Sequence, residues 1–465
     1  MSERAVSGVP AQIPSLGVLV AYGSIAVPLC LAEIPIVVYL PAFYAKELSL
    51  SAGLVGVVFL LARLWDGLSD ITVGWLSDRS TSSLGRRKPW VIAGAPFLVL
   101  SSWYLCNPPR DPSLAYLAIW AALFYTAFTA VKIPHLSWGT ELATEYVQRS
   151  RVTSVREAFT MLGSLAFVTG PLILLKDDSD LRGILFLVSM TTLITVPPAA
   201  IALWAFVRDP QVTSIGESHL LQKMASLAND RVLRRFLLGR LIFATEEGVC
   251  NSLLILSFGA GLQLADKFFW LIFILYVATL CTLPGTLSLA RRVEKHRLLA
   301  SGIAIQAIVY GIVVSLPHIN FLSAAVLWAV LGAANTAMLS LPTSILADII
   351  DCGEVSTGER LSGAYVAIDN LTYKIGMALG VGIGFGLLEL VHFVPGAAVH
   401  DSGDVLNIKL IGFGLPCLLS SLAVIPYFTH PITRAVQKGL REQIESTRKA
   451  PEPVERDTKA WAMAD

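Results

Sequence analysis

The sequence predicts an all-α polytopic membrane protein, with twelve transmembrane helices in two pseudo-symmetric six-helix bundles. Of its 465 residues, 54% are hydrophobic and only 15% are charged, and the mean hydropathy is +0.65. This is far from the balance of a soluble globular protein. Apolar runs long enough to cross about 30 Å of hydrocarbon, which takes about 20 helical residues, recur along the whole chain. The longest internal polar segment, Arg208 to Arg235, divides these runs into six and six.

Each apolar run is expected to be one membrane span. The predicted spans are 15–44, 50–78, 88–106, 112–144, 150–176, 182–207, 234–262, 266–291, 297–316, 321–351, 359–391 and 404–429. Interior Pro and Gly interrupt several of them, which membrane bundles tolerate where neighbouring helices satisfy the freed backbone groups. Met1 to Pro14 lack the features of a removable signal peptide, so we expect the first span to stay in the mature protein.

Lys and Arg gather in alternate loops and are sparse in the loops between them. By the positive-inside rule the basic loops and both termini face the cytoplasm. We therefore expect a multi-pass protein of the cell (inner) membrane, in contact with lipid. The expected parts are an N-terminal six-helix bundle (1–207), a cytoplasmic middle loop (208–233), a C-terminal six-helix bundle (234–429) and a cytoplasmic tail (430–465). A basic loop between the second and third spans of each bundle is a weak internal repeat.

Several classes of function have no support in the sequence. The net charge of +1 gives no field that would attract nucleic acid. The six cysteines lie singly, without metal-ligand spacing. No Walker A loop, GxSxG or HExxH motif occurs, so we expect neither an enzyme nor an ATP-driven pump. No cofactor is expected beyond a coupling ion.

The second span carries ionisable side chains in its interior. Arg63, Asp66 and Asp70 recur at helical spacing and project towards one side. Two carboxylates so close together in a dry site retain a proton or hold a cation between them, which is how a coupling-ion site works. The alternative is a structural ion pair in which Arg63 neutralises one aspartate.

The fourth span is interrupted by Thr129 and by three ionisable residues, Lys132, His135 and Glu141. A lysine in mid-membrane needs an anionic partner or a wet cavity. Asp66 or Asp70 could be that partner, and an anionic substrate is an equal candidate. A histidine alone is more often a satisfied interior residue than a proton carrier.

The second half supplies its own candidates. Lys374 in the eleventh span is a natural counter-charge for the aspartates of the second span, and Asn370 and Tyr373 lie beside it in sequence. Glu246 and Glu247 lie within the seventh span. Either could line a cavity, but neighbouring positions on a helix are not expected to do so together.

The cytoplasmic ends of the spans carry further charges. Arg156 and Glu157 begin the fifth span, and because adjacent helical residues face different directions, Arg156 could face a central cavity while Glu157 meets the basic loops. The other charges are expected to form a salt-bridge gate rather than to contact substrate. The expected members of this gate are Asp78, Arg79, Arg86, Arg149, Asp351, Glu354 and Arg360.

Several separate blocks of sequence occur in the order LARLWDGLSDITVGW, DRSTSSLGRRKPW, KIPHLSWG, RSRVTSVREAF, ADIIDCGEVSTGER and YKIGMALG. Together they resemble the glycoside-pentoside-hexuronide:cation symporter family (melibiose permease-like) of the major facilitator superfamily. The resemblance covers nearly the whole chain. It implies the major facilitator fold and transport by alternating access.

The resemblance also assigns residues. It implies a cation site made of Asp66 and Asp70 with Thr129, and Lys374 matches the family's lysine in the eleventh span. Ser69 stands where sodium-using members have Asn, which keeps both H⁺ and Na⁺ open as the coupling ion. Na⁺ is the metal ion that Asp66 and Asp70 would bind.

The sugar site departs further from the family pattern. Galactoside-binding members have Asp where Lys132 stands, another acid where Cys30 stands, and a tryptophan at Leu136. Arg156 matches a substrate-contacting arginine. The acids that would grip a neutral galactoside are therefore missing, and a positive charge replaces one of them.

These observations predict a secondary active transporter that couples H⁺ or Na⁺ to the symport of a sugar or glycoside. Lys132, His135 and Arg156 suggest an anionic, hexuronide-like substrate, and Tyr373 and Asn370 complete the expected binding set. The alternatives are a transporter of lipid-like or other amphipathic solutes, and an uncoupled facilitator in which a lysine sits permanently between the aspartates. The expected partners are a small-molecule substrate and the bilayer, without nucleic acid, and the expected state is a monomer.

Overall fold

The computed structural model describes residues 15–48, 50–80, 82–142, 146–174, 180–209, 227, 230–357, 362–395, 401–437 and 439. Within these ranges the secondary structure is almost entirely helical, and the one β-type contact is an isolated bridge between Ser82 and Gly85. This confirms the predicted all-α class.

The first half of the chain forms helices α1 to α8. Their bounds are α1 (Leu16–Ser24), α2 (Ala26–Val38), α3 (Leu40–Lys46), α4 (Ala52–Asp78), α5 (Lys88–Cys106), α6 (Leu114–Glu141), α7 (Tyr146–Leu174) and α8 (Leu181–Phe206). The first three make one span, broken at Ile25 and Tyr39. Pro28 and Pro41 follow the two breaks and lack the N–H that would bond back along the helix.

The second half forms the remaining helices. Their bounds are α10 (Arg231–Leu256), a π turn η1 (Ser257–Gly261), a 3₁₀ turn η2 (Ala265–Lys267), α11 (Phe268–Ala290), α12 (Lys295–Ser315), α13 (Phe321–Thr357), α14 (Ser362–Leu390), α15 (Ser402–Lys409), a π turn η3 (Leu410–Gly414) and α16 (Leu415–Phe428). Several helices begin at a polar cap. The Asp230 carboxylate, for example, accepts from the backbone N–H groups of Val232 and Leu233, at 2.8 and 3.1 Å, and so fixes the start of α10.

Eleven helical spans within the described ranges are long and apolar enough to cross a membrane. They correspond to all of the predicted spans except the fifth. That span is α7, a helix of 29 residues whose first half carries Arg151, Arg156 and Glu157. Its length is like that of the other spans, and several of its side chains lie outside the described residues.

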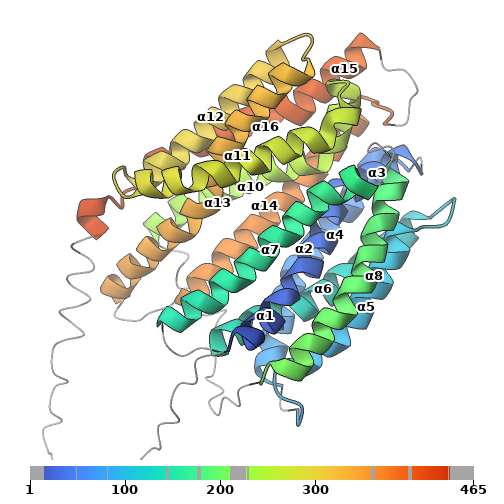
Figure 1. Ribbon diagram of the computed structural model, residues 1–465. Coiled ribbons are helices and arrows are strands. Elements are labelled where there is room, and N and C mark those ends of the chain that lie inside the picture. The colour runs from blue at the N-terminus through green and yellow to red at the C-terminus, as the bar shows by residue number, and fades with distance from the viewer. Residues whose placement is uncertain are drawn as a thin grey trace, which may run out of the picture.

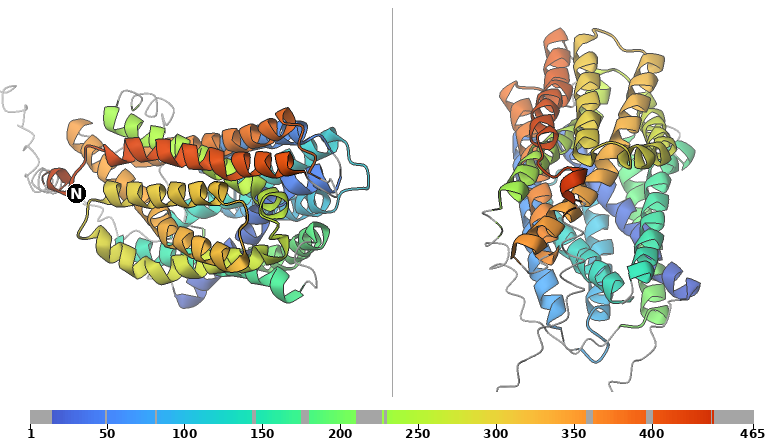
Figure 2. Two further views of the ribbon diagram at one scale, coloured as in Figure 1. Left: turned by 90° about the horizontal axis from the view of Figure 1, so that it is seen from above. Right: turned by 90° about the vertical axis from the view of Figure 1, so that its left-hand side faces the viewer.

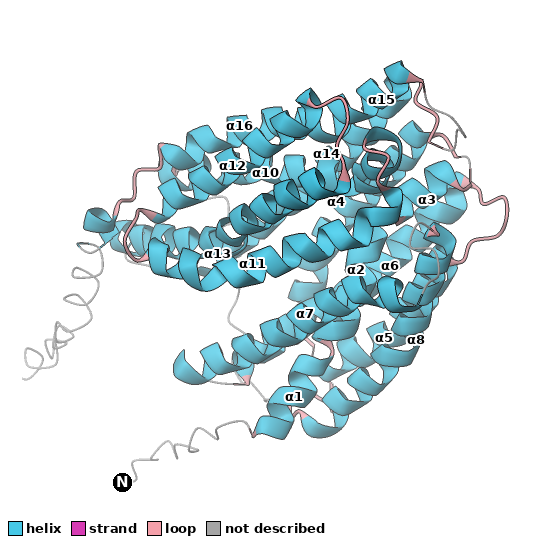
Figure 3. Ribbon diagram, turned by 45° about the horizontal axis from the view of Figure 1, so that its top comes forward, coloured by secondary structure: helices cyan, strands magenta, loops and turns pink. Residues whose placement is uncertain are grey.

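Helices α1 to α8 pack together in one group and helices α10 to α16 in another (Figure 1). The two groups meet mainly where α4 lies along α14, and also where α7 approaches α11 and α2 approaches α10. Two further views show that the helices of both groups run along one common axis (Figure 2). The groups approach each other at the end that holds α3 and diverge towards the end that holds α1 (Figure 3).

Close packing of α10 on α14 depends on glycines. A Cβ atom at Gly248 would collide with the backbone of Met377 and Gly380, and one at Gly380 would collide with the backbone of Thr245 and Gly248. Small residues allow helix backbones to approach in this way inside membranes. This contact sets the polar residues of α10 beside those of α14.

Polar and aromatic contacts join the two groups at the α3 end. The Glu389 carboxylate at the end of α14 accepts from Ser51 Oγ and from the backbone N–H of Gly53, at 3.1 and 3.0 Å, at the start of α4. Nearby, the Tyr39 ring lies against Phe268 and Phe269, with centroids 5.9 and 6.1 Å away. These contacts hold the first and second halves together at this end.

Candidate functional site

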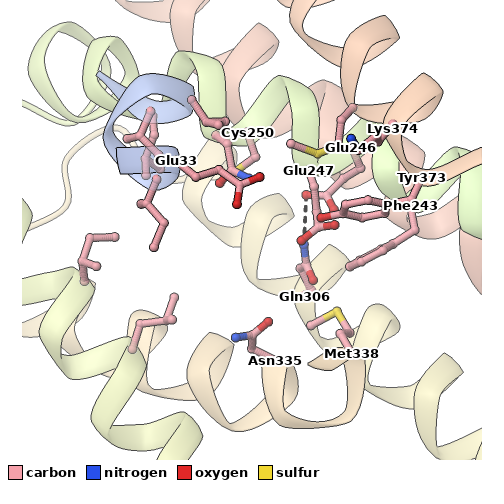
Figure 4. Close-up of a pocket in the computed structure, with 18 of the residues that line it drawn as sticks. Glu33, Phe243, Glu246, Glu247, Cys250, Gln306, Asn335, Met338, Tyr373 and Lys374 are labelled. Carbon is pink, nitrogen blue, oxygen red and sulfur yellow. Dashed lines mark hydrogen bonds between the residues drawn. The ribbon is translucent and has the colours of Figure 1, made fainter. Parts of the chain in front are cut away.

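A cavity of about 620 Å³ lies between the two halves, a volume within the range of small-molecule sites. Both halves contribute charged side chains to its wall, and Figure 4 shows part of it. The charged residues of the wall are Glu33, Arg63, Asp70, Lys132, Arg240, Glu246, Glu247 and Lys374. Its uncharged polar residues include Asn251, Gln306, Asn335, Asn370, Tyr310 and Tyr373.

The aspartates of α4 meet a lysine from the opposite half. Lys374 Nζ lies 2.8 Å from Asp66 Oδ2 and 2.5 Å from Asp70 Oδ2. Thr129 Oγ1 on α6 lies 3.2 Å from Asp66 Oδ1 and 2.9 Å from Asp70 Oδ1, and Ser69 Oγ lies 3.2 Å from Thr129 Oγ1. The fold thus brings the predicted cation-site residues and Lys374 into one cluster.

Arg63 completes this cluster. Its guanidinium lies 3.6 Å from the Asp66 carboxylate and over the ring of Tyr125, 4.9 Å from the centroid. Two carboxylates and two basic groups balance each other, so the cluster has no net charge when all four are ionised. The Lys374 ammonium lies between the carboxylates, where a coupling cation would lie.

The oxygens of the cluster suit a hard cation, because carboxylates and hydroxyls are the donors that such ions prefer. Within the described residues no group of three or more His, Cys, Asp or Glu could hold a metal ion. A Na⁺ ion here would bind Asp66 and Asp70, and the Thr129 and Ser69 hydroxyls are close enough to add a further ligand. The donor set fits a monovalent ion or a proton.

Lys132 pairs with an acid that sequence reasoning did not assign to it. Its Nζ lies 3.0 Å from Glu33 Oε2 on α2, and it also lies over the ring of Phe128. Neither Asp66 nor Asp70 is its ion-pair partner, which corrects one of the two expectations for Lys132. The sequence does contain a signal for this pair: Glu33 lies inside the first predicted span, and a carboxylate there needs a cationic partner just as Lys132 needs an anionic one.

Two expected substrate residues lie away from the cavity. His135 is 1% exposed, stacks on the Tyr22 ring at 4.3 Å, and has Nε2 2.8 Å from the Tyr22 carbonyl oxygen. Arg156 forms an ion pair with the adjacent Glu157. The expectation that these neighbours face different partners is wrong, because both side chains are long enough to reach each other. Neither His135 nor Arg156 is among the residues of the cavity wall.

Glu246 and Glu247 both line the cavity, contrary to the expectation that only one would. Adjacent positions on a helix project about 100° apart, and the cavity curves far enough around α10 to reach both. Glu246 faces α12, where Gln306 Nε2 donates to its Oε1 at 2.9 Å. Glu247 faces Tyr373 of α14.

A second ion pair joins α10 to α14. Arg240 Nε lies 3.1 Å from Asp369 Oδ1, and the guanidinium lies over the Tyr373 ring, 4.4 Å from its centroid. Asn370 and Tyr373, both expected in the binding set, line the cavity beside this pair. Sequence reasoning did not assign Arg240, although an arginine inside a span is a signal of the same kind as Lys132.

The expected gate residues lie near the far ends of the helices. Arg79 is exposed and stacks on Trp75, 4.2 Å from its ring centroid, and Arg86, Asp351 and Glu354 are half-buried. The side chains of Asp78 and Arg149, and all of Arg360, lie outside the described residues. The gate stays a prediction.

Comparison with known proteins adds to this geometry. A family model described as MFS/sugar transport protein matches residues 21–434. The "Glucuronide carrier protein homolog" of Escherichia coli is 21% identical over 422 residues, which cover 88% of this chain and 91% of that protein. The "Sodium-dependent lysophosphatidylcholine symporter 1-B" of Danio rerio is 21% identical over 459 residues, 84% of this chain and 82% of that protein.

Among solved structures, the nucleoside transporter NupG matches with a TM-score of 0.66 at 13% identity, over 90% of this chain and 100% of that chain. An identity so low shows the fold alone, and the fold is that of a major facilitator transporter. The relatives and the structural neighbour are membrane transporters, not enzymes. The structural neighbour confirms the predicted fold, and the family model together with the glucuronide carrier homolog confirms the resemblance to the glycoside-pentoside-hexuronide family. The chain is a multi-pass membrane transporter that belongs to the MFS/sugar transport protein family.

Proposed function

We propose that the protein is a secondary active symporter that moves a sugar or glycoside by alternating access, driven by H⁺ or Na⁺ bound at Asp66 and Asp70. One observation carries the proposal. The ammonium group of Lys374 lies between these two carboxylates, at the edge of a cavity large enough for a small organic solute.

The charge balance of the cluster suggests how ion binding is coupled to movement. Asp66 and Asp70 are already balanced by Arg63 and Lys374, so an arriving cation has to displace Lys374. The aspartates belong to α4 and the lysine to α14, in opposite halves of the molecule. Exchange of the lysine for an ion therefore breaks a contact between the halves and shifts the balance between conformations.

The distribution of Lys and Arg over the loops suggests the orientation of the chain in the membrane. We propose that the basic loops and both termini lie in the cytoplasm of a cell (inner) membrane, that residues 1–207 and 234–429 are the two moving bundles, and that the chain works as a monomer. The α3 end then faces outward. The contacts of Glu389 and Tyr39 join the halves at that end, and the halves diverge towards the opposite end, so we infer that the substrate enters this conformation from the cytoplasm.

The cavity favours a substrate with hydroxyl groups over an anion. Lys132 is neutralised by Glu33, Arg240 by Asp369, and Lys374 by the aspartates. No basic group of the described cavity wall is left to balance a substrate carboxylate, which weakens the hexuronide prediction. The ion pairs and the amides of Asn251, Asn335 and Asn370 offer donors and acceptors for neutral hydroxyls.

Uptake into proteoliposomes tests the proposal. The probes are radiolabelled methyl glucoside, methyl glucuronide and a lysophosphatidylcholine, each with an imposed H⁺ or Na⁺ gradient. Accumulation of methyl glucoside that depends on one gradient supports it. Accumulation of methyl glucuronide alone would restore the anionic substrate, lysophosphatidylcholine alone would favour a lipid transporter, and indifference to both gradients would indicate an uncoupled facilitator.

A pair of variants tests the role of Lys132. Lys132→Met leaves the Glu33 carboxylate unpaired beside the cavity and should reduce the free energy of unfolding by about 1 to 3 kcal/mol, less than for a dry ion pair because water in the cavity screens the charges. Adding Glu33→Gln should recover most of the loss. If the double variant transports methyl glucoside and the single variant does not, the lysine balances Glu33; loss of transport in both would make it a substrate ligand.

A variant of Glu389 tests the outer closure. Glu389→Gln weakens the hydrogen bonds to Ser51 and Gly53 and should favour the outward-open conformation by about 1 kcal/mol, about fivefold in population. The measurement is the labelling rate of Ile34→Cys, a position on the cavity wall, by an impermeant maleimide added outside to a protein that lacks the six native cysteines. Glu47→Gln, an exposed acid at the same end, is the control. Equal labelling rates in both variants would show that Glu389 does not help to hold the α3 end closed.

A further inference from the structure

Two carboxyl groups in the cavity have no basic partner. Each cation of the wall is paired with an acid, as described above, and the acids of those pairs are Glu33, Asp66, Asp70 and Asp369. Glu246 and Glu247 remain. Within the described part of the chain neither takes part in an ion pair, and the nearest candidate, Arg240, already binds Asp369 at 3.1 Å.

Glu246 is in a setting that disfavours its ionised form. Its side chain is fully buried, at 0% exposure, and the groups that hydrogen-bond to it are neutral: Gln306 Nε2 donates to Oε1 at 2.9 Å, and the Tyr310 hydroxyl lies beside it. Its Oε2 is buried without a hydrogen-bond partner in the described residues. A buried carboxylate that has only neutral donors and no counter-charge is costly, and such a group takes up a proton instead.

The neighbours of Glu246 add to this preference. On the same helix lie Glu247, which adds a like charge, and Cys250, whose Sγ lies 3.4 Å from Tyr310 Oη. The facing elements contribute Gln306 from α12, Asn335 from α13 and Tyr373 from α14, with Glu33 of α2 across the cavity (Figure 4). Tyr310, also on α12, lies beside Gln306. The positive charges near the pair are Arg240 of α10 and Lys374 of α14, and these are paired with Asp369 and with Asp66 and Asp70.

We propose that Glu246 and Glu247 form a proton-binding site in the second half of the molecule. This site is separate from the Asp66–Asp70 cluster, and the two glutamates together hold one proton when no substrate is bound. Glu247 is half-buried and lines the cavity, so it exchanges the proton with cavity water, whereas Glu246 stores it. The reaction is a simple protonation of one carboxylate.

The position of the site connects it to the first half. Glu247 faces Tyr373, and the next residue of α14, Lys374, pairs with Asp66 and Asp70. Loss of the proton places a second negative charge against α14, on α10 and not on α4, which carries the aspartates. This charge would attract Lys374 away from them, so release of the proton favours binding of the coupling ion. The proton site is independent of which ion that is.

Infrared difference spectroscopy of the reconstituted protein tests the proposal, with a pH titration in the carboxylic acid C=O stretching region. We expect the wild-type protein to show a protonated carboxyl band at neutral pH that shifts in deuterated buffer. Glu246→Gln should remove the band, and Glu247→Gln should make it disappear at a lower pH, because the like charge is gone. Glu47→Gln and Glu389→Gln are matched controls and should leave it unchanged.

Two results would overturn the proposal. One is the absence of the band from the wild-type protein at neutral pH, which needs no variant, and the other is an unchanged band in both Glu246→Gln and Glu247→Gln. If Glu246→Gln does not fold, the titration of the wild-type protein and the Glu247→Gln variant still test the proposal. Asp70→Asn should keep the band even where it abolishes coupled uptake, which separates a failure of this site from a failure of the proposed symport.

Discussion

Asp70→Asn should abolish gradient-driven accumulation of the transported solute. Asp70 is the carboxylate of the cluster that lines the cavity, and its Oδ2 lies 2.5 Å from Lys374 Nζ. An asparagine has no charge to hold either the lysine or an arriving ion. Breaking such a pair by removing one partner costs about 3 to 5 kcal/mol, so we expect accumulation to fall by more than about a hundredfold.

The measurement is the solute accumulated in proteoliposomes under an imposed H⁺ or Na⁺ gradient, beside exchange of labelled for unlabelled solute without a gradient. Exchange should survive, because the cavity wall outside the cluster is intact. Asp266→Asn is the matched control, since Asp266 is an exposed aspartate at the α3 end that pairs with Lys267. Undiminished accumulation in Asp70→Asn would show that Lys374 is a permanent counter-charge and that no ion binds there.

Lys374→Met should make the stability of the protein depend on the coupling ion. Among the described residues it leaves Asp66 and Asp70 with Arg63 as their one basic partner, at 3.6 Å from Asp66. The excess carboxylate should reduce the free energy of unfolding by about 3 to 5 kcal/mol in the absence of ions. An ion that binds only the folded state restores stability by mass action, so the variant should be stabilised strongly by the ion that the wild-type protein uses.

Thermal unfolding in NaCl and in choline chloride, each at two pH values and at equal ionic strength, identifies this ion. If Na⁺ stabilises Lys374→Met, the coupling ion is Na⁺. If only low pH stabilises it, the coupling ion is H⁺. Lys409→Met is the control, because Lys409 is also a buried lysine but donates to the carbonyl oxygens of Leu316 and Pro317. Its loss should destabilise the protein without any dependence on the ion. Adding Asp70→Asn to Lys374→Met should rebalance the cluster and remove the ion dependence.

The sequence alone predicted part of the Asp66–Asp70 cluster, because each charged residue inside a span was expected to have a partner of opposite charge. The four-residue spacing of Asp66 and Asp70 placed both on one helical face, and an unpaired lysine in the eleventh span was a natural partner for them. The same reasoning failed for Lys132, because Glu33 was not counted among the groups that needed a partner. It failed again for Glu246 and Glu247, because the shape of a cavity is not visible in the spacing of residues.

The sequence by itself determined the class of protein, the number and order of its spans and the polar residues inside them. These properties depend on local hydropathy and on helical periodicity, which a single segment carries. Only the tertiary structure decided which charge meets which. Lys374 lies about three hundred positions from Asp70 in the chain, and it reaches that carboxylate because α4 packs along α14. The energy of a buried charge depends on the partner that packing brings to it, and no local pattern encodes that partner.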